Sequence, residues 1–270
     1  MPRNDSKKSR NLAIGAGVAV AALLLGVASY TATKPDGSSG TAVTEEAQGA
    51  GPSDGREAQA GVYPELEKLA RRDANDPLAL GDADAPVVMV EYADFKCGFC
   101  GKFARDTEPG LVEKYVEKGT LRIEWRNFPI FGEDSERAAR GAWAAGRQGR
   151  FKQFHKAAYA EGSKEKGFGE DRLKELADEA GVKDVGRFVK DADSAAAKAA
   201  VDKDREEAYG LGATSTPSFL VNGRPISGAQ PDQVFEQAIE AAAKSAKSAK
   251  SDKNSDDPAQ GGGAGEGGSR

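Results

Sequence analysis

The sequence is poor in the residues that cross-link a fold or bind a metal ion. Its 270 residues include two cysteines and one histidine. A fold stapled by disulfides carries several cysteines spread along the chain, so that class of protein is excluded. A zinc site needs four ligands, and His155 follows Cys100 by about 55 residues, so carboxylates or a second chain would have to complete one. We therefore expect no metal and no other cofactor.

The chain also has fewer positive than negative side chains. The chain has 38 Lys and Arg residues against 43 Asp and Glu residues, which gives a net charge of −5. No stretch of the sequence forms a basic stripe. Nucleic acid is therefore not an expected partner, because proteins that bind it neutralise phosphates with clustered Lys and Arg.

The two cysteines lie together in the tetrapeptide Cys97-Gly98-Phe99-Cys100. Thiols separated by two residues close onto each other with little backbone movement. A purely structural bridge is the alternative, but a loop closed over two residues removes little entropy from the unfolded chain. The spacing instead indicates a reversible dithiol/disulfide switch.

The amino terminus has the pattern of a membrane-targeting segment. Basic side chains in residues 1–11 precede an uncharged run at residues 12–30, whose length approaches the ~20 residues of a bilayer-spanning helix. This pattern predicts a cytoplasmic segment at 1–11 and a single-pass cell-membrane anchor at 12–30. The alternative is a cleaved signal peptide, with Gly26-Val27-Ala28 as the cleavage site and a secreted product. Both interpretations place the rest of the chain outside the cytoplasm, where disulfides persist.

Composition divides the remainder of the chain into three parts. Residues 31–61 are mostly Gly, Ser, Thr, Ala and acidic residues, with almost no large apolar side chains, which predicts a flexible linker. Residues 244–270 are of low complexity, and we expect a disordered tail there. Residues 62–243 are left as one globular domain. We expect this domain to be a monomer.

The globular part begins with a strand–helix–strand pattern. A short apolar run at residues 86–92 predicts a buried strand. The cysteines then open a helix that continues to a glycine stop at Gly119, with Pro109 as a kink inside it. Residues 121–128 alternate apolar and polar side chains, which predicts a half-buried strand. Because a helix joins the two strands, we expect them to be parallel.

Helical patterns and then a hairpin follow. Apolar and aromatic residues recur at helical spacing between about residues 133 and 210, with breaks at glycines. A short strand at 217–221 leads into Asn222-Gly223, the strongest short hairpin signal, and residues 224–227 pair back. A final helix ends the domain. The predicted order is β-α-β, a helical insertion, then β-β-α.

Three segments together resemble the DsbA-like branch of the thioredoxin superfamily. They are residues 81–100 with the CxxC motif, residues 149–159 in the helical stretch, and residues 212–224 with the sequence Thr-Pro-Ser-Phe. The resemblance covers about residues 78–243. It implies an α/β, thioredoxin-like fold with an inserted helical subdomain at about 133–210. The dipeptide between the cysteines is Gly-Phe, where the best-known members carry Pro-His, so the histidine that assists the thiolate in those members is missing.

The position of each cysteine predicts its role. Cys97 lies at the start of a helix, where unpaired N–H groups and the positive end of the dipole stabilise an anion. Its pKa should fall below that of a free thiol, which makes Cys97 the candidate nucleophile. Cys100 lies one turn further in and is the candidate resolving thiol. The resemblance implies the same two roles.

Three further residues take candidate roles from the resemblance. An acidic residue at the position of Glu91 exchanges protons with the inner cysteine, and a buried carboxyl with a raised pKa is suited to this. A carboxylate that merely reaches water is the alternative. Thr216 and Pro217 match the loop that faces the CxxC pair, where the proline is cis and the backbone before it pairs with an extended substrate. An ordinary trans proline is the alternative there. His155 is assigned to packing.

The sequence is therefore identified as that of an extracytoplasmic thiol–disulfide oxidoreductase. We expect it to donate disulfides to reduced or misoxidised secreted proteins, and a membrane quinone-linked thiol oxidase to reoxidise it. A disulfide reductase or isomerase is the alternative within the same class. A non-catalytic binding protein that keeps the thioredoxin fold is the alternative from another class.

Overall fold

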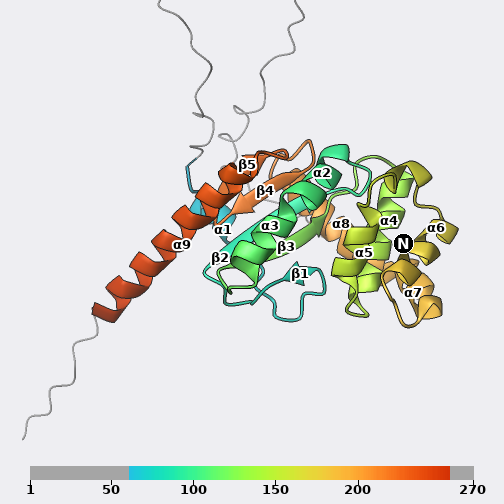
Figure 1. Ribbon diagram of the computed structural model, residues 1–270, viewed down its shortest axis with the longest axis horizontal. Coiled ribbons are helices and arrows are strands. Elements are labelled where there is room, and N and C mark those ends of the chain that lie inside the picture. The colour runs from blue at the N-terminus through green and yellow to red at the C-terminus, as the bar shows by residue number, and fades with distance from the viewer. Residues whose placement is uncertain (1–60, 256–270) are drawn as a thin grey trace, which may run out of the picture. The chain divides into compact units, whose positions relative to one another are not determined.

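The computed structural model describes residues 61–255 and builds them around a mixed sheet of five strands (Figure 1). The strands lie in the order β1-β3-β2-β4-β5. Their bounds are Ala79–Leu80 for β1, Val87–Ala93 for β2, Leu121–Asn127 for β3, Ser218–Val221 for β4 and Arg224–Ser227 for β5. Strands β2 and β3 are parallel, as predicted, and the other pairs are antiparallel.

Most of the helices belong to the insertion between β3 and β4, which Figure 1 shows gathered beside the sheet. The insertion consists of α4 (Glu133–Gly146), α5 (Phe151–Ala158), the 3₁₀ turn η3 (Lys164–Lys166), α6 (Glu170–Glu179), α7 (Val185–Ala192) and α8 (Ala195–Gly210). The other helices are α1 (Pro64–Glu67), α2 (Gly98–Asp106), α3 (Glu108–Leu111), the π-helical turn η2 (Val112–Val116) and α9 (Asp232–Ser255).

Strand β2 is buried on both faces, which explains its nearly continuous apolar sequence. On one face Val87 and Met89 join a cluster with Phe103 of α2 and Phe235 of α9. On the other face Val88, Val90 and Tyr92 pack with Phe128 and Ala208. The strand that leads to the cysteines is therefore held in the middle of the fold.

The segment after the cysteines is broken where one kinked helix was predicted. Helix α2 ends at Asp106, Thr107 caps it, and α3 begins at Glu108 with Pro109 in its first turn. Proline lacks an N–H, and its ring clashes with the carbonyl four residues earlier, so it is tolerated at a helix start but not inside a helix. The break therefore falls just before the proline.

The hairpin predicted at Asn222-Gly223 is confirmed by the pairing of β4 with β5. Both turn residues have positive φ angles, 42° and 77°, as a two-residue hairpin turn requires. A side chain at Gly223 would place its Cβ 2.5 Å from the carbonyl oxygen of Tyr63, so glycine also allows the N-terminal segment to cross the turn.

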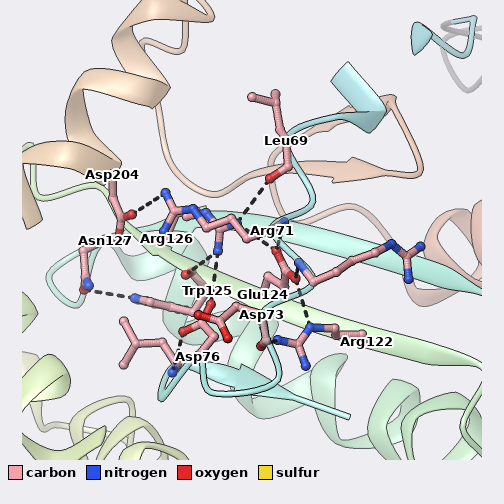
Figure 2. A network of polar contacts seen from close by, with 12 residues as sticks. Leu69, Arg71, Asp73, Asp76, Arg122, Glu124, Trp125, Arg126, Asn127 and Asp204 are labelled. Carbon is pink, nitrogen blue, oxygen red and sulfur yellow. Dashed lines mark hydrogen bonds and ion pairs between the residues drawn. The ribbon is translucent and has the colours of Figure 1, made fainter. Parts of the chain in front are cut away.

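Strand β3 departs from its prediction, because all seven of its residues are buried. The polar face that was expected to meet water carries Arg122, Glu124 and Arg126, and residues 69–76 cover it (Figure 2). Glu124 accepts hydrogen bonds from both guanidinium groups at 2.9 and 2.8 Å. It also accepts the backbone N–H groups of Arg71 and Arg72 at 2.9 and 2.8 Å. Charges that satisfy one another in this way tolerate burial.

Helix α9 corrects the predicted boundary of the tail. The disordered tail was expected from residue 244, but the helix runs on to Ser255. The helix is packed by Phe235 and Ile239, and the Ala- and Lys-rich sequence beyond them has high helix propensity, so each further turn propagates from one already formed.

Several predicted segments lie outside the described residues. These are the basic segment at 1–11, the anchor or signal at 12–30, the linker up to residue 60, and the tail after residue 255. Within 61–255, no helix is both long and apolar enough to cross a membrane.

Candidate active site

The two cysteines lie at the carboxyl end of β2, where the chain turns into α2. Cys97 is the N-cap of α2, with extended backbone angles of φ −73° and ψ 120°, and Cys100 lies in the first turn. Both thiols are free, so the structure describes the reduced state. The sequence predicted this placement at a helix start.

The Cys97 sulfur is surrounded by groups that favour its thiolate. The backbone N–H of Cys100 points at the sulfur from 3.3 Å. A hydrogen bond from the Cys100 thiol is the largest cause that lowers the pKa of Cys97, and the backbone N–H groups of Cys100 and Phe99 add to it. Burial opposes the shift, and the resulting pKa is about 6. Cys97 is thus largely ionised at neutral pH.

Cys100 has the opposite environment. Its side chain is fully buried, and burial raises the pKa of its thiol well above the ordinary value. The hydrogen bond that it gives to Cys97, and the negative charge of Cys97, raise it further. The pair therefore consists of one acidic and one protonated thiol.

The loop before β4 faces Cys97, as the sequence analysis expected. The Thr216–Pro217 peptide bond is cis. When Cys97 is protonated, its thiol can donate to the carbonyl oxygen of Thr216, which lies 3.2 Å from the sulfur. The buried Thr216 side chain also faces the Cys97 sulfur and helps to lower the pKa of Cys97. The structure thus brings together two segments separated by more than a hundred residues in the sequence.

Glu91, which is in β2, lies near the cysteines. Its side chain is buried, and its Oε1 has no hydrogen-bond partner among residues 61–255. Burial is the main cause that raises the pKa of Glu91 well above its ordinary value, and the charges of Glu108 and Cys97 contribute. Burial of this kind favours the protonated form of the carboxyl.

Asp94 organises the turn between β2 and α2, although the sequence analysis did not single it out. Its carboxylate accepts the N–H groups of Lys96 at 2.8 Å, Ile130 at 2.7 Å and Phe131 at 3.2 Å. Its carbonyl accepts the Cys97 N–H at 3.0 Å and the Tyr159 hydroxyl at 2.9 Å. An Asp that bonds the N–H two residues later forms an Asx turn, so an Asp three residues before the first cysteine was the available signal.

His155 is buried among aromatic rings, as expected for a packing residue. Its ring lies 5.0 Å from that of Trp125 and 4.9 Å from that of Tyr159, centroid to centroid. Its Nδ1 also lies 3.7 Å from Oε2 of Glu108, a buried residue that the sequence analysis did not single out. Burial lowers the pKa of His155 to about 3, so the ring is neutral at neutral pH and the contact is not an ion pair.

Two exposed phenylalanines belong to the segments around Cys97. Phe99, inside the motif, is 69% exposed, and Phe131, whose N–H bonds Asp94, is 52% exposed. Large apolar side chains in contact with water are informative where they border a reactive group, because they favour contact with apolar segments of a partner.

The arrangement is suited to thiol–disulfide exchange. It presents an acidic thiol at a helix N-terminus, a protonated thiol behind it, and an unbonded buried carboxyl in the adjacent strand. Over residues 61–255, no three His, Cys, Asp or Glu side chains gather in a way that could hold a metal ion.

Comparison with known proteins gives a consistent result. The model of the thioredoxin family matches residues 73–241. A probable disulfide bond formation protein D from Bacillus cereus is 36% identical over 172 residues, which covers 62% of this chain and 78% of the relative. A thioredoxin-like oxidoreductase from Silicibacter pomeroyi superposes with a TM-score of 0.57 at 28% identity, over 68% of this chain and 99% of that chain. Alpha-DsbA1 from Wolbachia pipientis has the same fold, with a TM-score of 0.58 at 22% identity, over 66% of this chain and 100% of that chain. These matches confirm the predicted thioredoxin-like fold with a helical insertion.

Proposed function

Because the chain belongs to the thioredoxin family, in its DsbA-like branch, and is a protein thiol–disulfide oxidoreductase, we propose that it donates disulfides to newly translocated proteins. The single observation that supports this direction is the lowered pKa of Cys97, about 6. A thiolate exists in the reduced protein and not in the disulfide, so whatever stabilises it favours the reduced form. A pair with a stabilised reduced form gives its disulfide away readily.

Donation proceeds in two exchange steps. A client thiolate attacks the Cys97 sulfur of the oxidised pair, the bond to Cys100 breaks, and the Cys100 sulfur leaves with the electron pair. Since Cys100 is buried and its pKa is raised, it takes up a proton, and Glu91 is the group positioned to supply it. A second client thiolate then attacks the client sulfur of the mixed disulfide, and Cys97 leaves as a thiolate. The client has lost two electrons and the cysteine pair has gained them.

The backbone before Pro217 and the exposed phenylalanines suit the docking of a client. The Thr216 carbonyl already bonds the Cys97 thiol, so the loop and the reacting sulfur lie within reach of one extended segment. Phe99 and Phe131 offer apolar contact beside that segment. A reduced or unfolded client exposes the apolar residues that such a surface binds.

The proposal also includes a location and a source of oxidising equivalents. Residues 12–30 anchor the chain in the cell membrane, and the domain acts outside the cytoplasm as a monomer. A quinone-linked thiol oxidase in the membrane accepts the electrons and restores the disulfide. If the apolar run is instead a signal peptide, the mass of the mature chain will reveal the cleavage.

Oxidative refolding of a reduced client protein tests the direction. The oxidised full-length protein should restore client activity and lose one disulfide for each one that the client gains. With a client that already holds a disulfide, the Cys97 thiolate of Cys100→Ala should attack that disulfide, release one client thiolate and accumulate the mixed disulfide, because no second active-site thiol remains to displace the client. The matched variant Cys97→Ala should neither refold the client nor trap it.

Two outcomes would contradict the proposal. If the protein reduces insulin rapidly but fails to oxidise the client, it is a reductase. If neither cysteine variant traps a client and the wild type exchanges no disulfide, the domain binds without catalysis.

A further inference from the structure

A second buried carboxyl group lies beneath the active site. Glu108 is in the first turn of α3, and only 7% of its surface is exposed, although it forms no ion pair with a Lys or Arg among the described residues. Glutamate is rarely buried without a cationic partner, because water solvates its charge better than the protein does. This placement requires an explanation beyond packing.

A continuous set of contacts joins Glu108 to the active site. Glu91 pairs across the sheet with Trp125, so the two side chains lie side by side on one face. The Trp125 ring lies 5.0 Å from the His155 ring, and Nδ1 of His155 lies 3.7 Å from Oε2 of Glu108. Neighbouring side chains thus lead from Glu91 by way of Trp125 and His155 to Glu108.

The exposed fraction of the side chains increases from Cys100 through Glu91 to Glu108. Cys100 is 0% exposed, Glu91 1% and Glu108 7%, while Lys152 on α5 is exposed. A proton on Cys100 has no direct contact with water, whereas one on Glu108 lies near the surface.

Burial and nearby charges set the acidity of Glu108. Burial raises the pKa of Glu108 to about 7, and the positive charge of Lys152 opposes the shift. The negative charge of Glu108 in turn raises the pKa of Glu91. From α5, the His155 ring also faces Glu108, and it is neutral at neutral pH. The other titratable groups of this region are Cys97, Cys100 and Tyr159, and burial raises the pKa of Tyr159 well above its ordinary value.

We propose that Glu108 is a positioning residue for the exchange reaction and relays protons between Glu91 and solvent, with His155 beside it. The inference rests on the proposed proton exchange between Glu91 and Cys100. When Cys100 leaves as a thiolate, it takes the proton of Glu91. Glu108 replaces the proton on Glu91 and regains one from water near Lys152. During reoxidation the proton moves in the reverse order, so each transfer breaks one bond to hydrogen and forms another.

The resolving step can be isolated in the purified protein. Cys97 is converted to a mixed disulfide with 5-thio-2-nitrobenzoate, and release of the coloured thiolate reports attack by Cys100. In the wild type the rate should rise with pH through about 7, because ionised Glu108 accepts the proton. Glu108→Gln should remove that rise and slow the step at neutral pH by about tenfold, less than the loss of a direct acid–base group. Glu113→Gln alters an exposed glutamate on the following turn and should match the wild type.

Parallel measurements on Glu91→Gln separate the two ideas. If Glu91→Gln alters the pH profile and Glu108→Gln leaves it unchanged, the relay through Glu108 is wrong and the proposed role of Glu91 stands. If Glu91→Gln also leaves it unchanged, the proton exchange in the proposed function is itself wrong.

A measurement on the wild type covers the case in which Glu108→Gln does not fold. Infrared spectra of the reduced wild type and of reduced Glu91→Gln should both show a protonated carboxyl band that disappears as the pH rises through about 7. Glu108→Asp, which keeps a titratable group, should retain the band at a shifted pH. The absence of any such band in the wild type would overturn the proposal.

Discussion

At the scale of single residues, the two sulfurs differ because the fold treats them differently. Cys97 caps a helix and receives hydrogen bonds, so burial is outweighed and its pKa falls to about 6. Cys100 lies one turn deeper, where burial raises the pKa of its thiol. We therefore propose that the order of the two residues at a helix start decides which one attacks and which one resolves.

The acidity of Cys97 can be measured directly. Thiolate absorbance of the reduced protein should titrate with a pKa near 6. In Cys100→Ala the pKa should rise towards the value of about 8.5 for a free thiol, because the hydrogen bond from Cys100 is its largest cause. Cys97→Ala should show no titration near 6. An unchanged pKa in Cys100→Ala would show that another group stabilises the thiolate.

Part of the site could be predicted from the sequence, and part could not. Cys97 and Cys100 could be predicted from their two-residue spacing, and Pro217 from the Thr-Pro-Ser-Phe sequence around it. Asp94 and Glu108 act through neighbours that tertiary packing brings from the insertion and from the loop after β3. No local pattern reveals which of 43 acidic residues will be buried there.

At the scale of elements, β3 and residues 69–76 are joined by the charges around Glu124. Burial alone would raise the pKa of Glu124, but hydrogen bonds from the Arg71 backbone and from the guanidinium groups of Arg126 and Arg122 lower it to about 2. A carboxyl whose folded pKa is depressed stabilises the protein above its unfolded pKa. That contribution is lost as the pH falls from about 5 towards 2.

Replacement of this carboxylate should therefore destabilise the domain. Glu124→Gln removes the carboxylate that pairs with the buried guanidinium groups of Arg122 and Arg126, and it should lower the free energy of unfolding at neutral pH by about 3 kcal/mol. Denaturant titration at several pH values measures this loss, with Glu113→Gln as the exposed control. The loss should shrink as the pH approaches 2, since the wild-type carboxylate is then protonated. A loss that does not vary with pH would mean that packing, not charge, explains the effect.

The order of strands and helices was predictable from the sequence, but the burial of polar faces was not. The β2–α2–β3 unit, the insertion and the β4–β5 hairpin follow from periodicity and turn residues. Strand β1 and helix α1 are short, and tertiary contacts rather than their own sequence stabilise them. The alternation in β3 correctly indicated a strand, but alternation does not reveal whether water or another segment covers the polar side.

At the scale of the whole molecule, the sheet and the helical insertion both contribute to the surroundings of the cysteines. The sheet positions the helix start against the Thr216–Pro217 loop, and the insertion supplies Tyr159 and His155 behind the cysteines. Because the hydrogen bonds to Cys97 stabilise a thiolate that exists only in the reduced state, the reduced form of the pair should be favoured more than in a typical thioredoxin.

The reduction potential of the Cys97/Cys100 couple tests this central claim most directly. It is obtained by equilibrating the purified protein with glutathione buffers and measuring the fraction of free thiols. The account predicts a potential well above the value of about −270 mV for thioredoxin, towards the value of about −120 mV for a strong disulfide donor. A potential at or below about −270 mV would contradict it and identify the protein as a reductase.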